Sequence, residues 1–127
     1  MVSVLIVEDN QTLRDRVRQE IEEQQDLSVI GEAEDGLTAL HLAMELRPDV
    51  VVMDIGLARL DGVEATRRLK AVAPDITVVG LSLYDDEHTK KTMMNAGASA
   101  FVCKTRMREQ LVAAIMGCEA NKAKQAQ

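Results

Sequence analysis

At 127 residues the chain has the length of a single domain, and at that size about two-thirds of the unfolded surface can be buried on folding. Its 21 acidic and 15 basic residues give a net charge of -6, which excludes a sequence-independent grip on nucleic acid or on an anionic membrane. Only 2% of the residues are aromatic, so the core must be built from aliphatic side chains and methionine.

Five short runs rich in Val, Ile and Leu predict β-strands, and helical patterns separate them. The strands are expected at residues 2–7, 27–33, 49–54, 76–82 and 98–103. Three helices are predicted from apolar stripes, which we place at Leu13, Val17 and Ile21, at Leu37, Leu40 and Met44, and at Met107, Leu111, Ala114, Ile115 and Cys118. These are the first, second and fifth helices in chain order. The third is expected after Asp61-Gly62, and the fourth at residues 86–96, which carry the weakest apolar stripe of the five.

Turn and capping residues support the same division of the chain. Asp35-Gly36 and Asp61-Gly62 are expected to open the second and third helices, and Arg47-Pro48 to end the second. Pro74 follows the third helix, and Gly97 fits the left-handed cap position after the fourth. Five strand-then-helix units predict an α/β fold with a parallel sheet covered by helices on both faces. If strands one, three, four and five are neighbours, with strand two outside, the fold is a flavodoxin-like doubly wound (βα)5 three-layer sandwich with strand order 2-1-3-4-5, and we expect that arrangement.

Chemistry in such a fold is expected where the strands end, because ligands bind in the crevice at the carboxyl ends of parallel strands. The polar residues at the strand ends are Glu8, Asp9, Asp54, Ser82 and Lys104. Each acid alone reads as a solvated loop residue, but three on neighbouring strands repel one another unless a cation compensates. A site with oxygen ligands, only a few of which come from the protein, suits Mg²⁺ better than Ca²⁺. A hydroxyl and an ammonium would complement a phosphoryl group, although Lys104 could equally be a structural counter-ion for Asp54.

With these residues the sequence resembles the receiver domain of bacterial two-component response regulators, the phosphoaspartate module of two-component signalling. The resemblance rests on "VLIVEDN", "DVVVMDIGLARLDGVEATRRLK", "ITVVGLS" and "GASAFVCKT", and it covers nearly the whole chain. The segments "GASAFVCK" and "LVAAIM" are most similar to the NarL/FixJ (LuxR-type) subfamily, whose members carry a helix-turn-helix DNA-binding domain after the receiver.

The resemblance implies that Asp54 accepts a phosphoryl group from a sensor histidine kinase. It implies that Asp9 and Asp54 ligate Mg²⁺ directly, that Glu8 acts through water, and that the backbone carbonyl of Gly56 completes the protein ligands. Lys104 would pair with one phosphoryl oxygen. The chain would not be an enzyme with an external turnover reaction, although it would catalyse its own phosphorylation and dephosphorylation.

A switch is implied as well. Ser82 would bind another phosphoryl oxygen, and Phe101 fits the switch aromatic whose position follows the hydroxyl residue, although Phe101 could also be core packing alone. The implied partners are a histidine kinase, a second copy of the chain on phosphorylation, and DNA only through a C-terminal domain outside this sequence. No membrane partner is expected. Because no targeting segment is recognised and Cys103 and Cys118 lack metal-ligand spacing, we expect a cytoplasmic protein.

Three features depart from the family pattern or bear on it. Leu57-Ala58 replaces a common Met-Pro, which predicts a less stiff loop, and Thr105 replaces a proline that often follows a cis bond. A non-proline cis bond costs about 2.5–4 kcal/mol, so the Lys104-Thr105 bond is expected to be either strained or trans, with Lys104 placed differently. Leu83 and Tyr84 are bulky enough to shield an acyl phosphate from water, which predicts a long-lived phosphoform.

Several alternatives stay open at this point. Residues 1–120 are assigned to the receiver, whereas the polar segment 121–127 either extends the last helix or begins a linker to an output domain. A stand-alone regulator acting through protein contacts is the alternative function. An aspartyl-nucleophile phosphatase would need a general acid two residues after Asp54, where Gly56 stands. A flavin binder would need a phosphate loop after the first strand, where "EDNQT" is acidic.

Overall fold

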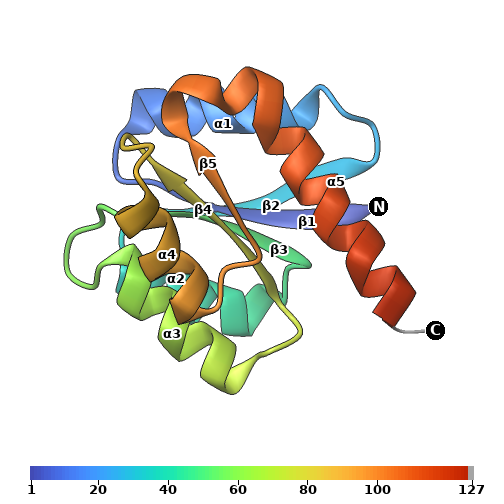
Figure 1. Ribbon diagram of the computed structural model, residues 1–127. Coiled ribbons are helices and arrows are strands. Elements are labelled where there is room, and N and C mark those ends of the chain that lie inside the picture. The colour runs from blue at the N-terminus through green and yellow to red at the C-terminus, as the bar shows by residue number, and fades with distance from the viewer. Residues whose placement is uncertain (126–127) are drawn as a thin grey trace.

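A computed structural model describes residues 1–125 of the chain, in which strands and helices alternate from end to end (Figure 1). In chain order the elements are β1 (Val2–Val7), α1 (Gln11–Glu22), β2 (Leu27–Ala33), α2 (Gly36–Leu46), β3 (Val50–Asp54), α3 (Gly62–Val72), β4 (Thr77–Ser82), α4 (Glu87–Ala96), β5 (Ala100–Cys103), a 3₁₀ turn (Lys104–Arg106) and α5 (Met107–Gln125).

The five strands form one parallel sheet in the order β2-β1-β3-β4-β5, which confirms the predicted topology. β1 and β2 have the predicted bounds, while β3, β4 and β5 begin one or two residues later than expected. The central strand β3 is buried at every residue from Val50 to Asp54. The strands are covered on both faces, so a continuous apolar run suits β3 better than an alternating one.

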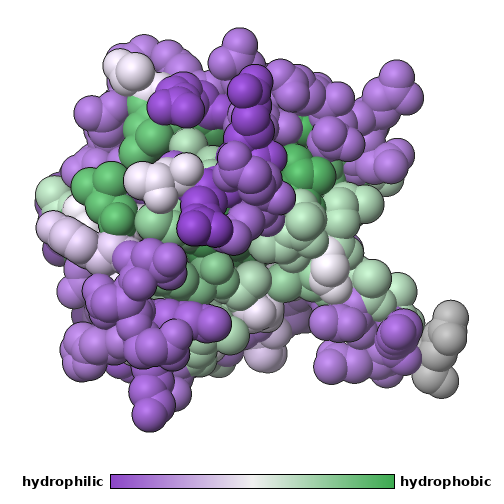
Figure 2. Space-filling model, turned by 45° about the horizontal axis from the view of Figure 1, so that its top comes forward, coloured by the Kyte–Doolittle hydropathy of each residue, from purple (hydrophilic) through white to green (hydrophobic). Residues whose placement is uncertain are grey.

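Helices cover the sheet in two layers, with α1 and α5 on one face and α2, α3 and α4 on the other (Figure 1). Under α1 and α5 the core contains Val17, Ile21, Leu111 and Ile115, all fully buried. Under the other three helices it contains Leu69 and Met93 together with several alanines. The core is aliphatic throughout, as the lack of aromatic residues predicts. Figure 2 shows hydrophilic side chains over most of the visible face, with apolar ones gathered in a band across its middle.

The capping residues act as the sequence predicts. The side chain of Asp35 accepts a hydrogen bond from the Thr38 amide at the start of α2, and Asp61 does the same for the Glu64 amide at the start of α3. Gly97 ends α4 with φ of 119°, a left-handed conformation that glycine adopts at little cost. Asp35 and Asp61 thus fix where α2 and α3 begin after β2 and β3, at the edge with the polar strand ends, whereas Gly97 turns the chain toward β5 at the opposite edge.

The predicted apolar stripe of α2 is wrong. Leu37 and Met44 are 43% and 40% exposed, and the buried residues of this helix are Gly36, Ala39 and Ala43. A β-carbon at Gly36 would lie 2.0 Å from the Leu60 carbonyl oxygen, so the start of α2 sits against the neighbouring loop at backbone distance. Small residues therefore make the fully buried face of α2, Leu40 of the predicted stripe packs partly buried at its margin, and Leu37 and Met44 point outward.

Helix α5 continues through Gln125, so residues 121–125 extend the last helix. Lys122 helps to hold this extension, because its Nζ donates to the Asp49 carbonyl at 3.3 Å and to Glu119 Oε1 at 3.1 Å. Residues 126 and 127 of the expected polar tail lie outside the described part of the chain. None of the helices within residues 1–125 is long and apolar enough to cross a membrane.

Candidate functional site

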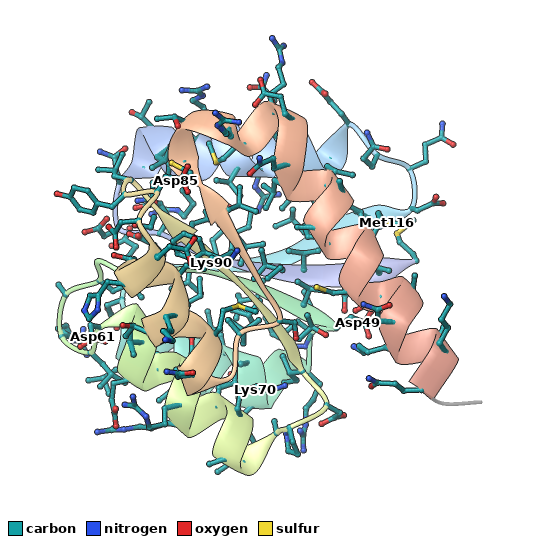
Figure 3. The ribbon with its side chains drawn as sticks, in the orientation of Figure 1. Asp49, Asp61, Lys70, Asp85, Lys90 and Met116 are labelled. Atoms are coloured by element: carbon teal, nitrogen blue, oxygen red, sulfur yellow. The ribbon has the colours of Figure 1, made fainter. Side chains whose placement is uncertain are left out.

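The carboxyl ends of β1, β3, β4 and β5 meet at one edge of the sheet, and the side chains predicted from the strand ends meet there too. A pocket of about 250 Å³ at this edge is lined by Asp9, Asp54, Ile55, Gly56, Ser82, Leu83, Tyr84 and Lys104. In Figure 3 this edge lies on the side of Asp61 and Asp85, which follow β3 and β4, while Asp49 marks the opposite end of β3.

Lys104 is the cation at the centre of the site, and it contacts two buried acids. Its Nζ lies 2.8 Å from Glu8 Oε1 and 3.0 Å from Asp54 Oδ1. The three side chains are 8%, 1% and 5% exposed, so these are short ionic contacts largely removed from water. Lys104 comes from the turn after β5, whereas Glu8 follows β1 and Asp54 ends β3. The ion pairs therefore tie three strand ends together.

The surroundings of Glu8 and Lys104 shift both pKa values. Burial raises the pKa of Glu8 to about 7, against the opposing effect of its hydrogen bond to Lys104. Burial alone would lower the pKa of Lys104, but its hydrogen bonds to Glu8 and Asp54 act the other way, and the net pKa is raised. The site therefore keeps Lys104 charged at neutral pH and holds Glu8 close to its midpoint of titration.

Three carboxylates at this edge are arranged as a group that fits a divalent cation. Glu8, Asp9 and Asp54 each offer an oxygen, and these oxygens lie within 4.8 Å of one another. Glu8 and Asp54 are buried, while Asp9 is exposed at the mouth of the pocket. When all three acids are ionised, Lys104 compensates only one of the three charges, which leaves negative charge in a poorly hydrated place. Hard oxygen ligands of this kind suit Mg²⁺.

The loop between β3 and α3 carries Gly56, the residue expected to offer its carbonyl to the metal. The Gly56 amide donates to Asp54 Oδ1 at 3.2 Å, so this loop also contacts the acid from its backbone side. Leu57 is buried in the core. Arg59 adopts φ of 66°, and its Nη1 lies 3.3 Å from Oδ2 of Asp35, the cap of α2. The loop that lacks the family's Met-Pro is therefore attached to the first turn of α2.

Ser82 and Phe101 lie on the same face of the sheet, next to the pocket. Phe101 is in register with Gly80, and Ser82 stands two residues further along β4, opposite Cys103. Ser82 is 2% exposed, and its Oγ accepts a hydrogen bond from the Tyr84 amide at 3.0 Å. Phe101 is half-buried against the cluster that includes Met93. The arrangement places the aromatic ring and the hydroxyl one strand apart.

The peptide bond between Lys104 and Thr105 is trans, which decides between the two conformations expected from the sequence. Lys104 nevertheless reaches both Glu8 and Asp54. Thr105 Oγ1 lies 3.2 Å from the sulfur of Cys103, which is buried and has a free thiol. The substitution of the family's proline thus leaves the lysine in contact with the acids.

Arg14 and Asn10 were missed by sequence reasoning, and both contact Glu8. Asn10 caps α1 through its side chain, and its backbone amide donates to Glu8 Oε2 at 3.2 Å. Arg14 is 7% exposed, and its Nη1 donates to the Glu8 carbonyl at 2.8 Å. The available signal was the position of Arg14 beside Leu13, a residue of the apolar stripe of α1. An arginine on a buried helix face needs polar partners.

An open α/β sheet with three acids, a hydroxyl and a lysine at its carboxyl edge is the arrangement that the sequence predicts for a receiver domain. Comparison with known proteins agrees: residues 4–116 match the model of the response regulator receiver domain. The chain is 36% identical over 115 residues to the response regulator GacA of Pseudomonas aeruginosa, with 91% of this chain and 54% of GacA covered. It is 34% identical to the transcriptional regulatory protein LiaR of Bacillus subtilis, with the same two coverages.

A solved LuxR-family two-component response regulator from Aurantimonas sp. SI85-9A1 superposes with a TM-score of 0.91. The two sequences are 30% identical, and 95% of this chain and 86% of that chain are covered. The chain therefore belongs to the response regulator receiver domain family, with LuxR-family and NarL-type regulators among its relatives. It spans about half the length of the curated relatives it matches.

Proposed function

We propose that this receiver accepts a phosphoryl group on Asp54 from a sensor histidine kinase in the cytoplasm, with Mg²⁺ bound by the acids of the pocket. The observation that carries the proposal is the contact of 3.0 Å between Asp54 Oδ1 and Lys104 Nζ inside a pocket that Asp9 and Ser82 also line. One carboxylate is thus held at the end of a buried strand, with a cation beside it and room in front of it for a phosphoryl group.

Phosphoryl transfer asks a protein mainly for positioning and for compensation of the charge on the phosphoryl oxygens. Asp54 would attack the phosphorus, and the bond from phosphorus to the donor's leaving atom would break as the acyl phosphate forms. Lys104 would pair with one phosphoryl oxygen and Ser82 would donate its hydroxyl to another, a proposal supported by the position of both residues in the wall of the pocket. Asp9, Asp54 and the Gly56 carbonyl would hold Mg²⁺, with Glu8 acting through water. When bound, the ion would supply further charge compensation.

The same geometry supports a switch that follows phosphorylation. Ser82 Oγ accepts from the Tyr84 amide, and its own hydroxyl hydrogen would donate to a phosphoryl oxygen as Ser82 moves toward Asp54. Such a movement would alter the space beside Phe101 on the neighbouring strand and bias the surface formed by α4, β5 and α5. We propose that this surface controls dimerisation and a C-terminal DNA-binding domain, as the names of the curated relatives suggest for transcriptional output. No external turnover reaction is part of the proposal.

Intact mass after incubation with acetyl phosphate and Mg²⁺ tests the function directly. We expect a gain of one phosphoryl group in the wild type and in Asp85→Asn, which changes an exposed acid of the β4–α4 loop, and no gain in Asp54→Asn. Chelation of Mg²⁺ should abolish the gain in every variant. An equal gain in Asp54→Asn, or no gain in the wild type, would contradict the proposal. Steady hydrolysis of phosphate esters by the wild type would show an enzyme instead.

A further inference from the structure

Helix α1 contains a buried arginine that belongs to neither the pocket nor the apolar core. The guanidinium of Arg14 makes three contacts: Nη1 donates to the Glu8 carbonyl at 2.8 Å, Nε to Glu32 Oε1 at 2.9 Å, and Nη2 to Glu34 Oε1 at 3.4 Å. Two of the acceptors are carboxylates on or just after β2. The remaining acceptor is the backbone carbonyl of Glu8, just after β1, and this hydrogen bond is buried.

Glu8, whose carbonyl accepts from Arg14, has a partner for each of its other polar groups as well. The Glu8 amide donates to the Ala33 carbonyl at 3.0 Å, and the Glu8 carboxylate bonds to Lys104 and to the Asn10 amide. Arg14 holds the remaining polar group, the carbonyl. Because a peptide unit is planar, fixing the Glu8 carbonyl also fixes the nitrogen and α-carbon of the next residue, Asp9.

We propose that Arg14 is a positioning residue for the Mg²⁺ site, acting through the peptide bond that joins Glu8 to Asp9. Asp9 is exposed and makes no strand pairing, so its backbone needs another restraint if its carboxylate is to face Asp54. Arg14 supplies that restraint from α1. Outer contacts that orient metal ligands typically change metal affinity by about 10- to 100-fold when they are removed. The inference rests on the proposed function, since it assumes that Asp9 ligates Mg²⁺.

A purely structural role for Arg14 would be to join α1 to β2, and Arg18 offers the matched comparison. Arg18 lies one turn further along α1, and its Nε donates to Glu32 Oε2 at 2.9 Å, so it joins the same two elements. Its other partner is Glu22 on α1 itself, at 3.4 Å. Arg18 thus shares the carboxylate of Glu32 with Arg14 but has its other contacts away from Glu8.

The test is a Mg²⁺ titration of Arg14→Met and Arg18→Met, followed by tyrosine fluorescence. The chain has one tyrosine and no tryptophan, and Tyr84 lines the pocket, so its emission reports on the site. We expect Arg14→Met to weaken Mg²⁺ binding about 10-fold or more, and Arg18→Met to stay within about twofold of wild type. In the metal-free protein, hydrogen exchange of the Asn10 amide, which belongs to the peptide bond after Asp9 and donates to Glu8 Oε2, should accelerate in Arg14→Met and remain unchanged in Arg18→Met. Arg14→Lys, which keeps the charge and can reach one acceptor, should give an intermediate affinity, and it serves as the test if Arg14→Met does not fold.

Equal effects of the two methionine variants on Mg²⁺ affinity and on exchange of the Asn10 amide would overturn the inference and leave a structural role. Wild-type affinity in the arginine-14 variants would also overturn it, whatever their melting temperatures. These failures are distinct from a failure of the proposed function. If the wild type itself neither binds Mg²⁺ nor accepts a phosphoryl group, the proposed function falls, and the inference falls with it.

Discussion

Replacing Lys104 with methionine should destabilise the protein strongly, because this single cation serves two buried acids. Each contact, at 2.8 Å and 3.0 Å, corresponds to an attraction of about 6 kcal/mol at an effective dielectric constant of about 20. Much of that attraction offsets the cost of removing the charges from water. Removal of one partner from a buried ion pair typically costs about 3–5 kcal/mol, and we expect a loss in that range for Lys104→Met at pH 8 without Mg²⁺.

The loss should depend on pH in a direction that the pKa of Glu8 determines. Burial raises this pKa to about 7 from the ordinary glutamate value of 4.5, so between these two pH values the native state binds a proton that the unfolded state has released. The contribution of Glu8 to stability is therefore fully present below about pH 4.5 and is lost as the pH rises through about 7. At pH 5.5 Glu8 is already mostly protonated in the wild type, so Lys104→Met leaves only Asp54 without its cation. At pH 8 the variant must in addition protonate Glu8 or keep it charged and unpaired, so the deficit should be smaller at pH 5.5 than at pH 8.

Urea unfolding followed by circular dichroism at pH 8 and pH 5.5, with and without Mg²⁺, measures these effects. Mg²⁺ should restore more stability to Lys104→Met than to the wild type, since the ion replaces a missing cation. Lys122→Met is the control, because Lys122 contacts no buried acid: its partners are Glu119, in a partly exposed ion pair, and the Asp49 carbonyl, and we expect their loss to cost about 1 kcal/mol. A loss below about 1 kcal/mol in Lys104→Met, or a deficit that is larger at pH 5.5 than at pH 8, would refute the reasoning.

Three further predictions follow from the site and its supports. Leu83→Ala should shorten the lifetime of phosphorylated Asp54 several-fold, measured as the decay of the phosphorylated mass, because Leu83 lines the pocket and is bulky enough to limit water; an unchanged decay would contradict this. Gly62→Ala should lower the melting temperature, because its β-carbon would lie 2.0 Å from the Asp54 carbonyl oxygen, whereas Gly117→Ala, with open space around it in α5, should gain about 0.5–1 kcal/mol. Glu8→Gln should flatten the fall in stability between about pH 4.5 and pH 7 seen by urea unfolding of the wild type, and a parallel pH profile would show that another group titrates there.

The order of elements, the sheet topology and the set of polar side chains that meet at the strand ends could all be predicted from the sequence. β-Strand runs, capping residues such as Asp61 and the left-handed Gly97 are local signals, and each is satisfied within a few residues of where it occurs. The grouping of Asp54 with Lys104 could also be predicted, since parallel strands end at the same edge.

The face of α2 could not be predicted in this way. Leu37, Leu40 and Met44 have helical spacing, but so do Gly36, Ala39 and Ala43, and periodicity does not say which face another element covers. The close backbone contact between Gly36 and Leu60 decides for the small residues. Such a contact depends on the position of a loop more than twenty residues further along the chain.

By itself, the sequence determined a doubly wound parallel sheet and the kinds of side chain at its carboxyl edge, because hydrophobic period and turn chemistry act over short stretches. Only the tertiary structure decided which residues contact one another. It shows that Lys104 pairs with both Glu8 and Asp54, and that Arg14 of α1 donates to the Glu8 carbonyl. The physical reason is that an ion pair or a buried hydrogen bond depends on the distance between two groups in space and on their removal from water. The spacing of residues along the chain determines neither.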